Sequence, residues 1–187
     1  MKKKATLLAE KHSSQRGKAK ALFYFVRDEI KYNPYPPHSV EDYRASKTLQ
    51  RREGYCVQKA VVLTALARAV GIPTRLGFAD IRNHLVPKDL LEIMGTDMFV
   101  YHGYSELWLN NGWVKATPAF NIEMCNKFDL EPVEFDGVTH AVFHERNKKG
   151  ELHIEYIKYH GTYADLPFEE IMQAFIDQYP VTRKEAK

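Results

Sequence analysis

Residues 53–75, EGYCVQKAVVLTALARAVGIPTR, place a lone cysteine at the start of a long apolar stretch. From Cys56 to about Val70 the apolar side chains recur with helical spacing and cover more than one face, which predicts a mostly buried helix. Gly71 is a favoured residue just after a helix, and Pro73 prevents continuation. Because cysteine is often a small packing residue inside cores, the position of Cys56 raises the question of whether its thiol has a chemical role.

The composition is that of an ordinary globular protein. Hydrophobic residues make up 44% and charged residues 27% of the 187 residues, and the formal net charge is +3. Several positive charges lie in the terminal stretches MKKK and TRKEAK, which we expect to be solvated tails, whereas a nucleic-acid-binding protein shows a dense basic stripe. We therefore expect a single domain over residues 1–187 and no nucleic-acid partner.

The cysteines and the apolar segments indicate the compartment. Cys56 and Cys125 form neither a disulfide framework nor a CxxC pair. ATLLA near the N-terminus is too short for the apolar centre of a signal peptide, and no stretch approaches the roughly 20 apolar residues that cross a bilayer. We expect a cytoplasmic protein with free thiols and no membrane association, in which Cys125 is a packing residue.

The remaining elements follow from periodicity and turn signals. Asn110-Asn111-Gly112 is a strong hairpin signal between two strand-like stretches. Helices first and strands later predict an α+β fold, with N-terminal helices and the Cys56 helix packed on an antiparallel sheet. We expect helices over 16–32 and 167–179, short turns at 45–50 and 87–94, and strands over 74–81, 98–109 and 112–117 and near 130–135, 139–144 and 151–158.

A thiol at the first residue of a helix lies beside unpaired N–H groups and the positive end of the helix dipole. These groups can lower the pKa of the thiol and can hold the oxyanion that forms when a thiolate attacks an acyl carbon. Such a nucleophile usually has an imidazole as proton acceptor. His102 is the best placed of the eight histidines, because it lies mid-strand just before the hairpin. Alternatively, Cys56 is a core residue and His102 a half-buried structural one.

Two stretches together resemble the transglutaminase-like superfamily. GYCVQKAVVLTALARAVGIPTRL (54–76) is similar to its nucleophile helix, and HGYSELWLNNGWVKATP (102–118) is similar to its second motif: histidine, Glu-aliphatic, a turn, tryptophan, then Asp-Pro. VRDEIKYNPY (26–35) also fits. The resemblance covers about residues 18–121, and residues 122–187, where we expect strands and a C-terminal helix, add no further motif.

The resemblance implies a papain-like α+β core, as in small bacterial members, with a Cys-His-Asp triad. The thiolate attacks an amide carbonyl, forms a thioester and passes the acyl group to water or an amine. Cys56 is then the nucleophile and His102 the general base, but the third position falls on Thr117. A threonine hydroxyl can accept the ring N–H and orient the imidazole, although it brings no charge. Thr117 is therefore a weaker orienter, or it marks a loss of catalysis.

Other side chains compete for the supporting roles. Asn121 is an alternative orienter, since an asparagine has this role in papain-like enzymes, and Gln50 could supply an oxyanion-hole amide or be a solvated turn residue. Glu106 shares a strand face with His102, but four residues of extended strand span about 13 Å, which is too far for contact. We expect Glu106 to be a structural or rim carboxylate.

The sequence leads to three functional hypotheses. The first is a cysteine-dependent enzyme that acts on peptide or protein amide bonds through a thioester. Hydrolysis is favoured over cross-linking, because cross-linking requires an amine to outcompete water, and no DxDxDG pattern supports calcium activation. Peptide hydrolysis, amide deamidation and acyl transfer to a small amine stay open. The second is a catalytically impaired binding module that keeps the scaffold. The third is a metal-stabilised protein using His140 and His144, but their HxxxH spacing lies in a strand-like setting without a third ligand, so we expect no metal and no cofactor.

Overall fold

The computed structural model describes residues 1–35, 37 and 39–180. Helices dominate the first part of the chain and strands follow, as the α+β expectation requires. In chain order the elements are α1 (Lys2–Ala9), α2 (Gln15–Glu29), β1 (Lys31–Tyr32), the 3₁₀ helix η1 (Val40–Tyr43), α3 (Ala45–Arg51), β2 (Glu53–Gly54), α4 (Cys56–Ala69), β3 (Thr74–Asn83), α5 (Lys88–Met94), β4 (Met98–Leu109), β5 (Gly112–Ala116), α6 (Ile122–Lys127), β6 (Ile154–Tyr163) and α7 (Phe168–Gln178).

Four strands form an antiparallel sheet in the order β5-β4-β3-β6. β4 pairs with β5 through the hairpin whose turn residues Asn110 and Asn111 have φ angles of 50° and 66°. Positive φ at both central residues is what a two-residue hairpin turn of the favoured type requires. A separate parallel pair joins β1 to β2, and it brings the end of α2 beside the start of α4.

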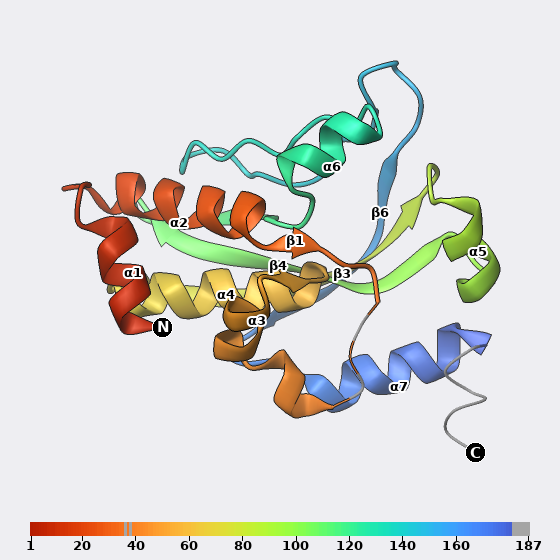
Figure 1. The fold of residues 1–187 in the computed structure, drawn as a ribbon, viewed down its shortest axis with the longest axis horizontal. Helices are drawn as coiled ribbons and strands as arrows, with labels where there is room; N and C mark the ends of the chain where they lie inside the picture. The colour runs from red at the N-terminus through yellow and green to blue at the C-terminus, as the bar shows by residue number, and fades with distance from the viewer. Residues whose placement is uncertain (36, 38, 181–187) are drawn as a thin grey trace.

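α4 is the central helix of the fold. It packs against β3 and β4, and α1, α2 and α3 also contact it, so that it runs along the sheet with α2 and α3 beside it (Figure 1). This enclosure explains why apolar residues occur around more than one face of α4. Burying each large aliphatic side chain there contributes about 2 kcal/mol. The fully buried residues of α4 include Val57, Ala60, Val62, Leu63, Leu66 and Ala67.

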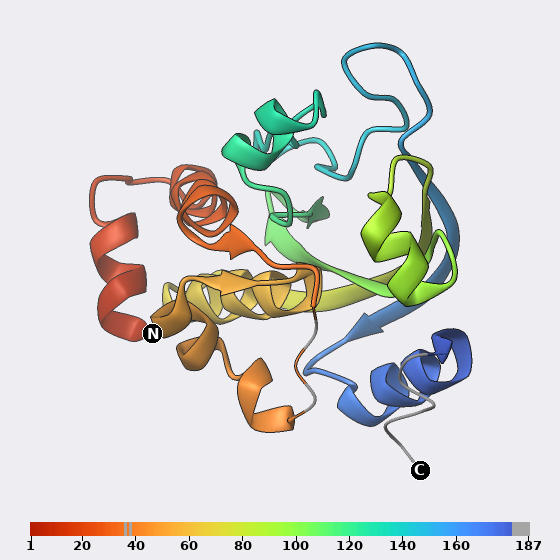
Figure 2. The same ribbon diagram turned by 45° about the vertical axis from the view of Figure 1, so that its right-hand side comes forward.

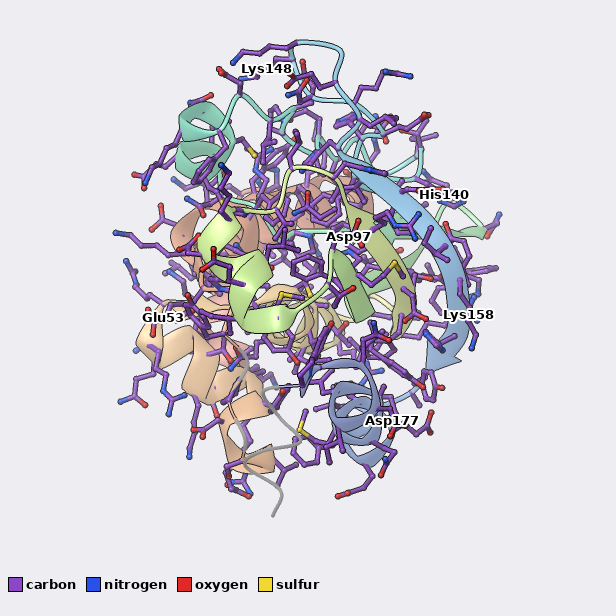
Figure 3. The ribbon with its side chains drawn as sticks, turned by 90° about the vertical axis from the view of Figure 1, so that its right-hand side faces the viewer. Glu53, Asp97, His140, Lys148, Lys158 and Asp177 are labelled. Atoms are coloured by element: carbon purple, nitrogen blue, oxygen red, sulfur yellow. The ribbon has the colours of Figure 1, made fainter. Side chains whose placement is uncertain are left out.

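The later helices surround the end of the sheet at which α4 begins. α5, α6 and α7 lie around this end (Figure 2). Seen from this side, the labelled charged side chains of Glu53, Lys148, Lys158 and Asp177 lie at the periphery of the molecule (Figure 3). No helix in the described part of the chain is long and apolar enough to span a membrane.

Most predicted elements are confirmed. The helices over 16–32, 45–50, 56–70 and 167–179 and the strands over 74–81, 98–109 and 112–117 are all present with small changes of boundary. The helical turn expected at 87–94 is α5. The α+β class with an antiparallel sheet is therefore correct.

Three other predictions need correction. The strands expected near 130–135 and 139–144 are wrong. Residues 130–135 form no strand, and the second segment makes only an isolated parallel bridge between Ala141 and Ala116. The strand expected at 151–158 begins later, as β6. The helices α1 and α6 were not predicted. α1 carries the basic residues expected in a solvated tail, yet its Ala5 and Ala9 are buried.

Candidate active site

Side-chain contacts fix the start of α4. Gln58 Oε1 accepts a hydrogen bond from the Tyr55 N–H (3.2 Å), and the Gln58 amide donates to the Asp42 carbonyl (2.9 Å). The Tyr55 hydroxyl donates to the Tyr43 hydroxyl (2.8 Å). Because these hydrogen bonds satisfy polar groups at the start of the helix, they fix the backbone conformation there. Cys56, the first residue of α4, therefore has a defined position.

The Cys56 thiol lies among N–H donors but is buried. The backbone N–H groups of Gly103, Val57 and Cys56 itself lie against Sγ and favour the thiolate. Burial is the larger effect, and it raises the pKa of Cys56 to about 11. The N–H groups at the helix start lower this pKa as expected, but burial outweighs them, so the net pKa of Cys56 is raised rather than lowered. At neutral pH the group is a thiol with N–H donors already in place.

β4 passes directly over the start of α4 at Gly103. A Cβ at this position would lie 2.8 Å from the Cα of Val57, which is backbone and cannot move aside cheaply. Only glycine permits such an approach. The contact sets His102, the preceding residue, beside the end of α4 that carries Cys56.

A β-bulge lies immediately before His102. β4 has two residues, Val100 and Tyr101, opposite Asp80 alone. Tyr101 has a φ of 52°, a left-handed conformation that is costly for a residue with a side chain. Asp80 stabilises it by accepting the Tyr101 N–H at 3.0 Å. Because a bulge changes the direction of the side chains around it, this one sets the direction of His102.

His160 completes the support of the bulge. Its Nε2 lies 2.7 Å from Asp80 Oδ1, the same oxygen that accepts the Tyr101 N–H. The imidazole of His160 also stacks on the Tyr101 ring, with centroids 4.1 Å apart and planes 15° apart. β3, β4 and β6 thus each contribute one residue to a cluster that holds the bulge.

The His102 ring is enclosed by aromatic side chains. Its centroid lies 4.8 Å from that of Phe143 and 6.2 Å from that of Tyr156. Nε2 is fully buried and has no hydrogen-bond partner. Burial lowers the pKa of His102 to about 3, so the ring is neutral at neutral pH.

Thr117 is buried on the sheet face that carries His102. Ser105 pairs with Ala116, so Thr117, one residue further, lies opposite Tyr104. Side chains alternate along a strand, so Tyr104 and His102 share a sheet face, and Thr117 lies on that face too. Thr117 is completely buried, and its Oγ1 has no hydrogen bond of regular geometry. The hydroxyl lies near that of Tyr156.

Cys56 and His102 line the same cleft, which has a volume of about 600 Å³. Asn121 lies in its wall, where Asn121 Oδ1 accepts the Tyr32 N–H at 3.2 Å and so ties β1 to the start of α6. Most of the lining is apolar or aromatic and comes from several elements. Examples are Tyr32, Leu90, Met94, Phe120, Phe128 and Phe175.

Gln50 is not brought to the cleft. It lies near the end of α3, is exposed and is absent from the cleft lining. Its amide is therefore not placed to serve as an oxyanion donor. The alternative expectation, that Gln50 is solvated, agrees with its exposed position. The donors beside the sulfur are backbone N–H groups instead.

A buried lysine close to Cys56 was missed. Lys59, one turn along α4, is completely buried, and its Nζ donates to the carbonyls of Arg27 (3.0 Å) and Ile30 (2.6 Å) at the end of α2. Burial, only partly offset by the nearby Asp28, lowers the pKa of Lys59 to about 7. The signal in the sequence was a charged residue inside an otherwise apolar helical stretch.

Glu106 has the structural role expected of it. Arg75 lies 2.7 Å from Glu106 Oε2, and the guanidinium also stacks over the Trp113 ring at 4.1 Å. Trp113 in turn packs edge-to-face on Trp108 across the hairpin. These contacts hold β3, β4 and β5 together.

Two further histidines, His140 and His144, and the second cysteine make local contacts. His140 Nδ1 accepts the Lys115 N–H (3.2 Å), and His144 Nε2 lies 3.3 Å from the Pro132 carbonyl. Cys125 is a free, buried thiol. Within residues 1–35, 37 and 39–180, no group of three His, Cys, Asp or Glu residues could hold a metal ion.

Comparison with protein families identifies the class to which this site belongs. The family model described as the transglutaminase-like superfamily matches residues 2–118, which is more than half of the chain. The chain belongs to the transglutaminase-like superfamily. No curated protein matches it significantly.

Solved structures show more distant likenesses. A candidate cysteine protease of Cytophaga hutchinsonii is 15% identical over 88% of this chain and 49% of its own, with a TM-score of 0.48. A candidate protease of Parabacteroides distasonis ATCC 8503 is 18% identical over 62% and 22%, with a TM-score of 0.47. The periplasmic domain of TgpA from Pseudomonas aeruginosa is 24% identical over 63% and 41%, with a TM-score of 0.45. The chain spans less than half the length of each.

Proposed function

We propose that the protein is a cysteine-dependent enzyme that cleaves or transfers amide-linked acyl groups, with Cys56 as nucleophile and His102 as general base. The observation that carries the proposal is that Cys56 and His102, which are far apart in the sequence, line one cleft where β4 crosses the start of α4. Membership of the transglutaminase-like superfamily supports the reaction class.

The proposed reaction has two halves. His102 removes the proton from the Cys56 thiol as sulfur attacks the amide carbonyl, and the imidazolium then gives that proton to the leaving amine as the C–N bond breaks. In the second half His102 takes a proton from water, or from an amine, which attacks the thioester and releases the Cys56 thiolate. The thiolate recovers its proton from the imidazolium. The N–H groups of Cys56 and Val57 are available to hold the oxyanion in both halves.

The protonation states argue against a preformed thiolate–imidazolium ion pair in the absence of substrate. The pKa of Cys56 is raised to about 11 and that of His102 is lowered to about 3, both by burial. Sulfur and imidazole are thus neutral before substrate binds. Proton transfer then takes place together with attack on the carbonyl rather than ahead of it.

The lining of the cleft indicates the substrate class. Its apolar and aromatic walls suit a peptide or protein amide with a bulky apolar side chain next to the reacting carbonyl, because burying that side chain supplies binding energy. The charged groups that also line it are Lys31, Lys127 and Glu123. A cytoplasmic setting, in which both thiols stay reduced, remains part of the proposal.

The test is covalent labelling with a peptide vinyl sulfone that carries phenylalanine next to the reactive group. We expect an adduct on Cys56 of the wild-type protein at neutral pH, located by peptide mass spectrometry. Cys56→Ala should abolish it, and His102→Ala should slow it by about 100-fold, the usual contribution of a general base. Cys125→Ala is the matched control and should react like wild type. Equal rates in wild type and His102→Ala would refute the catalytic role of His102.

A second candidate function is a binding module that retains the scaffold. Two observations favour it: Thr117 stands where the family has aspartate, and the pKa of Cys56 is raised rather than lowered. In that case phenylalanine-containing peptides should bind in the cleft with micromolar or weaker affinity, and no adduct or cleavage should occur. Isothermal titration calorimetry alongside the labelling assay separates the two functions.

The bulge before His102 leads to a further prediction. Asp80→Ala removes the acceptor of the Tyr101 N–H, so the left-handed conformation of Tyr101 should relax and His102 should turn away from Cys56. We expect labelling of Cys56 to slow by about 10-fold or more, since small misplacements of catalytic groups have effects of this size. Asp80→Asn keeps an acceptor oxygen and should lose less. Identical losses in the two variants would show that the hydrogen bond to Tyr101 does not set the direction of His102.

A further inference from the structure

Two buried polar atoms on the sheet face that carries His102 lack hydrogen-bond partners of regular geometry. They are Nε2 of His102 and Oγ1 of Thr117. Neither has solvent contact or a hydrogen bond of regular geometry, and Oγ1 lies near the Tyr156 hydroxyl. An unpaired buried polar atom costs about 1–3 kcal/mol, so native proteins rarely keep two in one place without a purpose. Both atoms lie close to one side chain, that of Tyr156 in β6.

Tyr156 is itself fixed by a second neighbour of the imidazole. Its hydroxyl accepts the Phe143 N–H at 3.3 Å, and the Phe143 ring lies against the His102 ring with centroids 4.8 Å apart and planes 33° apart. The Tyr156 ring meets the imidazole edge-on, at an interplanar angle of 71°. Phe143 and Tyr156 therefore enclose His102 on two sides and are tied to each other.

If His102 is a general base, its Nε2 must be protonated and needs a hydrogen-bond acceptor. A neutral imidazole carries one proton, and the nitrogen that takes the thiol proton must be the unprotonated one. Because Nε2 is buried, Nδ1 is the nitrogen left to face the cleft, and Nε2 must carry the proton and find an acceptor. An aspartate in the position of Thr117 would be that acceptor. In this chain the hydroxyl groups of Thr117, on the same sheet face, and of Tyr156, whose ring contacts the imidazole, are the candidates for this role.

We propose that Tyr156 is a positioning residue for His102 and that, together with Thr117, it takes over the orienting role of the absent aspartate. The Thr117 Oγ1 accepts the Nε2 proton of His102 and donates its own proton to the Tyr156 hydroxyl oxygen. That oxygen also accepts the Phe143 N–H, and the Tyr156 ring limits rotation of the imidazole. Burial raises the pKa of Tyr156 above its ordinary value, so the hydroxyl keeps its proton at neutral pH. The inference rests on the proposed function for its catalytic meaning, but not for its geometry.

Nuclear magnetic resonance of the imidazole N–H proton tests this positioning role directly. In the wild-type protein we expect the Nε2 proton of His102 to be shifted downfield and to exchange slowly with water. Tyr156→Phe keeps the ring and removes the hydroxyl, and Thr117→Val keeps the shape and removes the acceptor. Both should move the signal upfield and speed exchange by about 10-fold or more. Tyr159→Phe, on the same strand and 52% exposed, is the matched control and should leave the signal unchanged.

The labelling rate of Cys56 provides the kinetic readout. Tyr156→Phe and Thr117→Val should each slow it by about 10-fold, and the double variant should be no slower than the worse single variant, because the two hydroxyls act as one unit. An unchanged Nε2 proton signal in Tyr156→Phe would overturn the positioning role, whatever the labelling rate. A changed signal in a protein whose Cys56 is never labelled would support the positioning role and refute the proposed enzyme.

Discussion

Gly103→Ala should disable the site and destabilise the protein at the same time. The new Cβ would lie 2.8 Å from the Cα of Val57, so β4 must move away from α4. Forced separation of packed backbone should lower the free energy of unfolding by about 3 kcal/mol. For a chain of this size the melting temperature should fall by roughly 6–12 °C. The same movement takes His102 away from Cys56, so we expect labelling of Cys56 to fall by about 100-fold.

Gly112→Ala is the matched control on the same hairpin. The nearest atom to a Cβ at Gly112 is the Leu109 carbonyl oxygen at 3.9 Å, which is ordinary contact. Its effect on the free energy of unfolding should stay within about 0.5 kcal/mol. Thermal melts and the labelling assay, run on both variants, give the comparison. If Gly103→Ala melted and reacted like Gly112→Ala, β4 would not approach α4 as closely as the structure shows.

Lys59→Ala should be the second large effect, on stability alone. Removing Nζ leaves the carbonyls of Arg27 and Ile30 buried without their donor, and truncation leaves a cavity in the core. Together these should cost about 3 kcal/mol at about pH 8.5, where the amine is neutral and its desolvation cost is absent. Lys59→Met fills most of the volume and should cost less than Lys59→Ala. Urea unfolding measures both, and an unchanged stability in Lys59→Ala would contradict a role of Lys59 in capping α2.

The pH dependence of stability should reveal Lys59 separately. Its pKa is about 7 in the folded protein, against an ordinary value of 10.5 in the unfolded chain. Between these values the unfolded chain binds a proton that the folded protein releases, so the free energy of unfolding rises with pH; below about 7 the full cost of burying the charge is present. Comparison with Lys59→Met cancels the effects of the other titrating groups. The free energy of unfolding of the wild type, relative to that of Lys59→Met, should rise by about 2 kcal/mol from about pH 6.5 to 8.5. A flat difference would place the Lys59 pKa outside this range.

Local patterns were sufficient where each element depends mainly on its own sequence. The periodicity of the Cys56 helix, its end at Gly71 and the Asn110-Asn111-Gly112 turn each predict what is observed. The strand expected near 139–144 is reduced to one bridge, because its pairing with the end of β5 is limited to Ala141. The Ala141 N–H donates to the Lys115 carbonyl, and the Ala141 carbonyl accepts the Thr117 N–H, so that only an isolated bridge forms. Such pairing is set by the tertiary fold.

The site was predictable to a similar degree. Cys56 and His102 lie in recognisable motifs, and Thr117 could be identified as a residue that departs from the second of these motifs. The bulge at Tyr101 could not be foreseen, because no glycine or asparagine marks the left-handed residue and its stabilising partner, Asp80, lies on another strand. The raised pKa of Cys56 was equally hidden, since it depends on how deeply neighbouring elements bury the sulfur.

β6 loses its register with β3 at two points, where His160 and Ile157 are extra residues, and these irregularities affect how the protein behaves at high concentration. β6 is an outer strand, and an outer strand with a regular, flat edge can act as a template for strands of other molecules. The extra residues twist that edge, Gly161 has a φ of 87°, and Lys158 adds an exposed charge. The edge of the sheet formed by β6 is therefore poorly suited to cross-β growth.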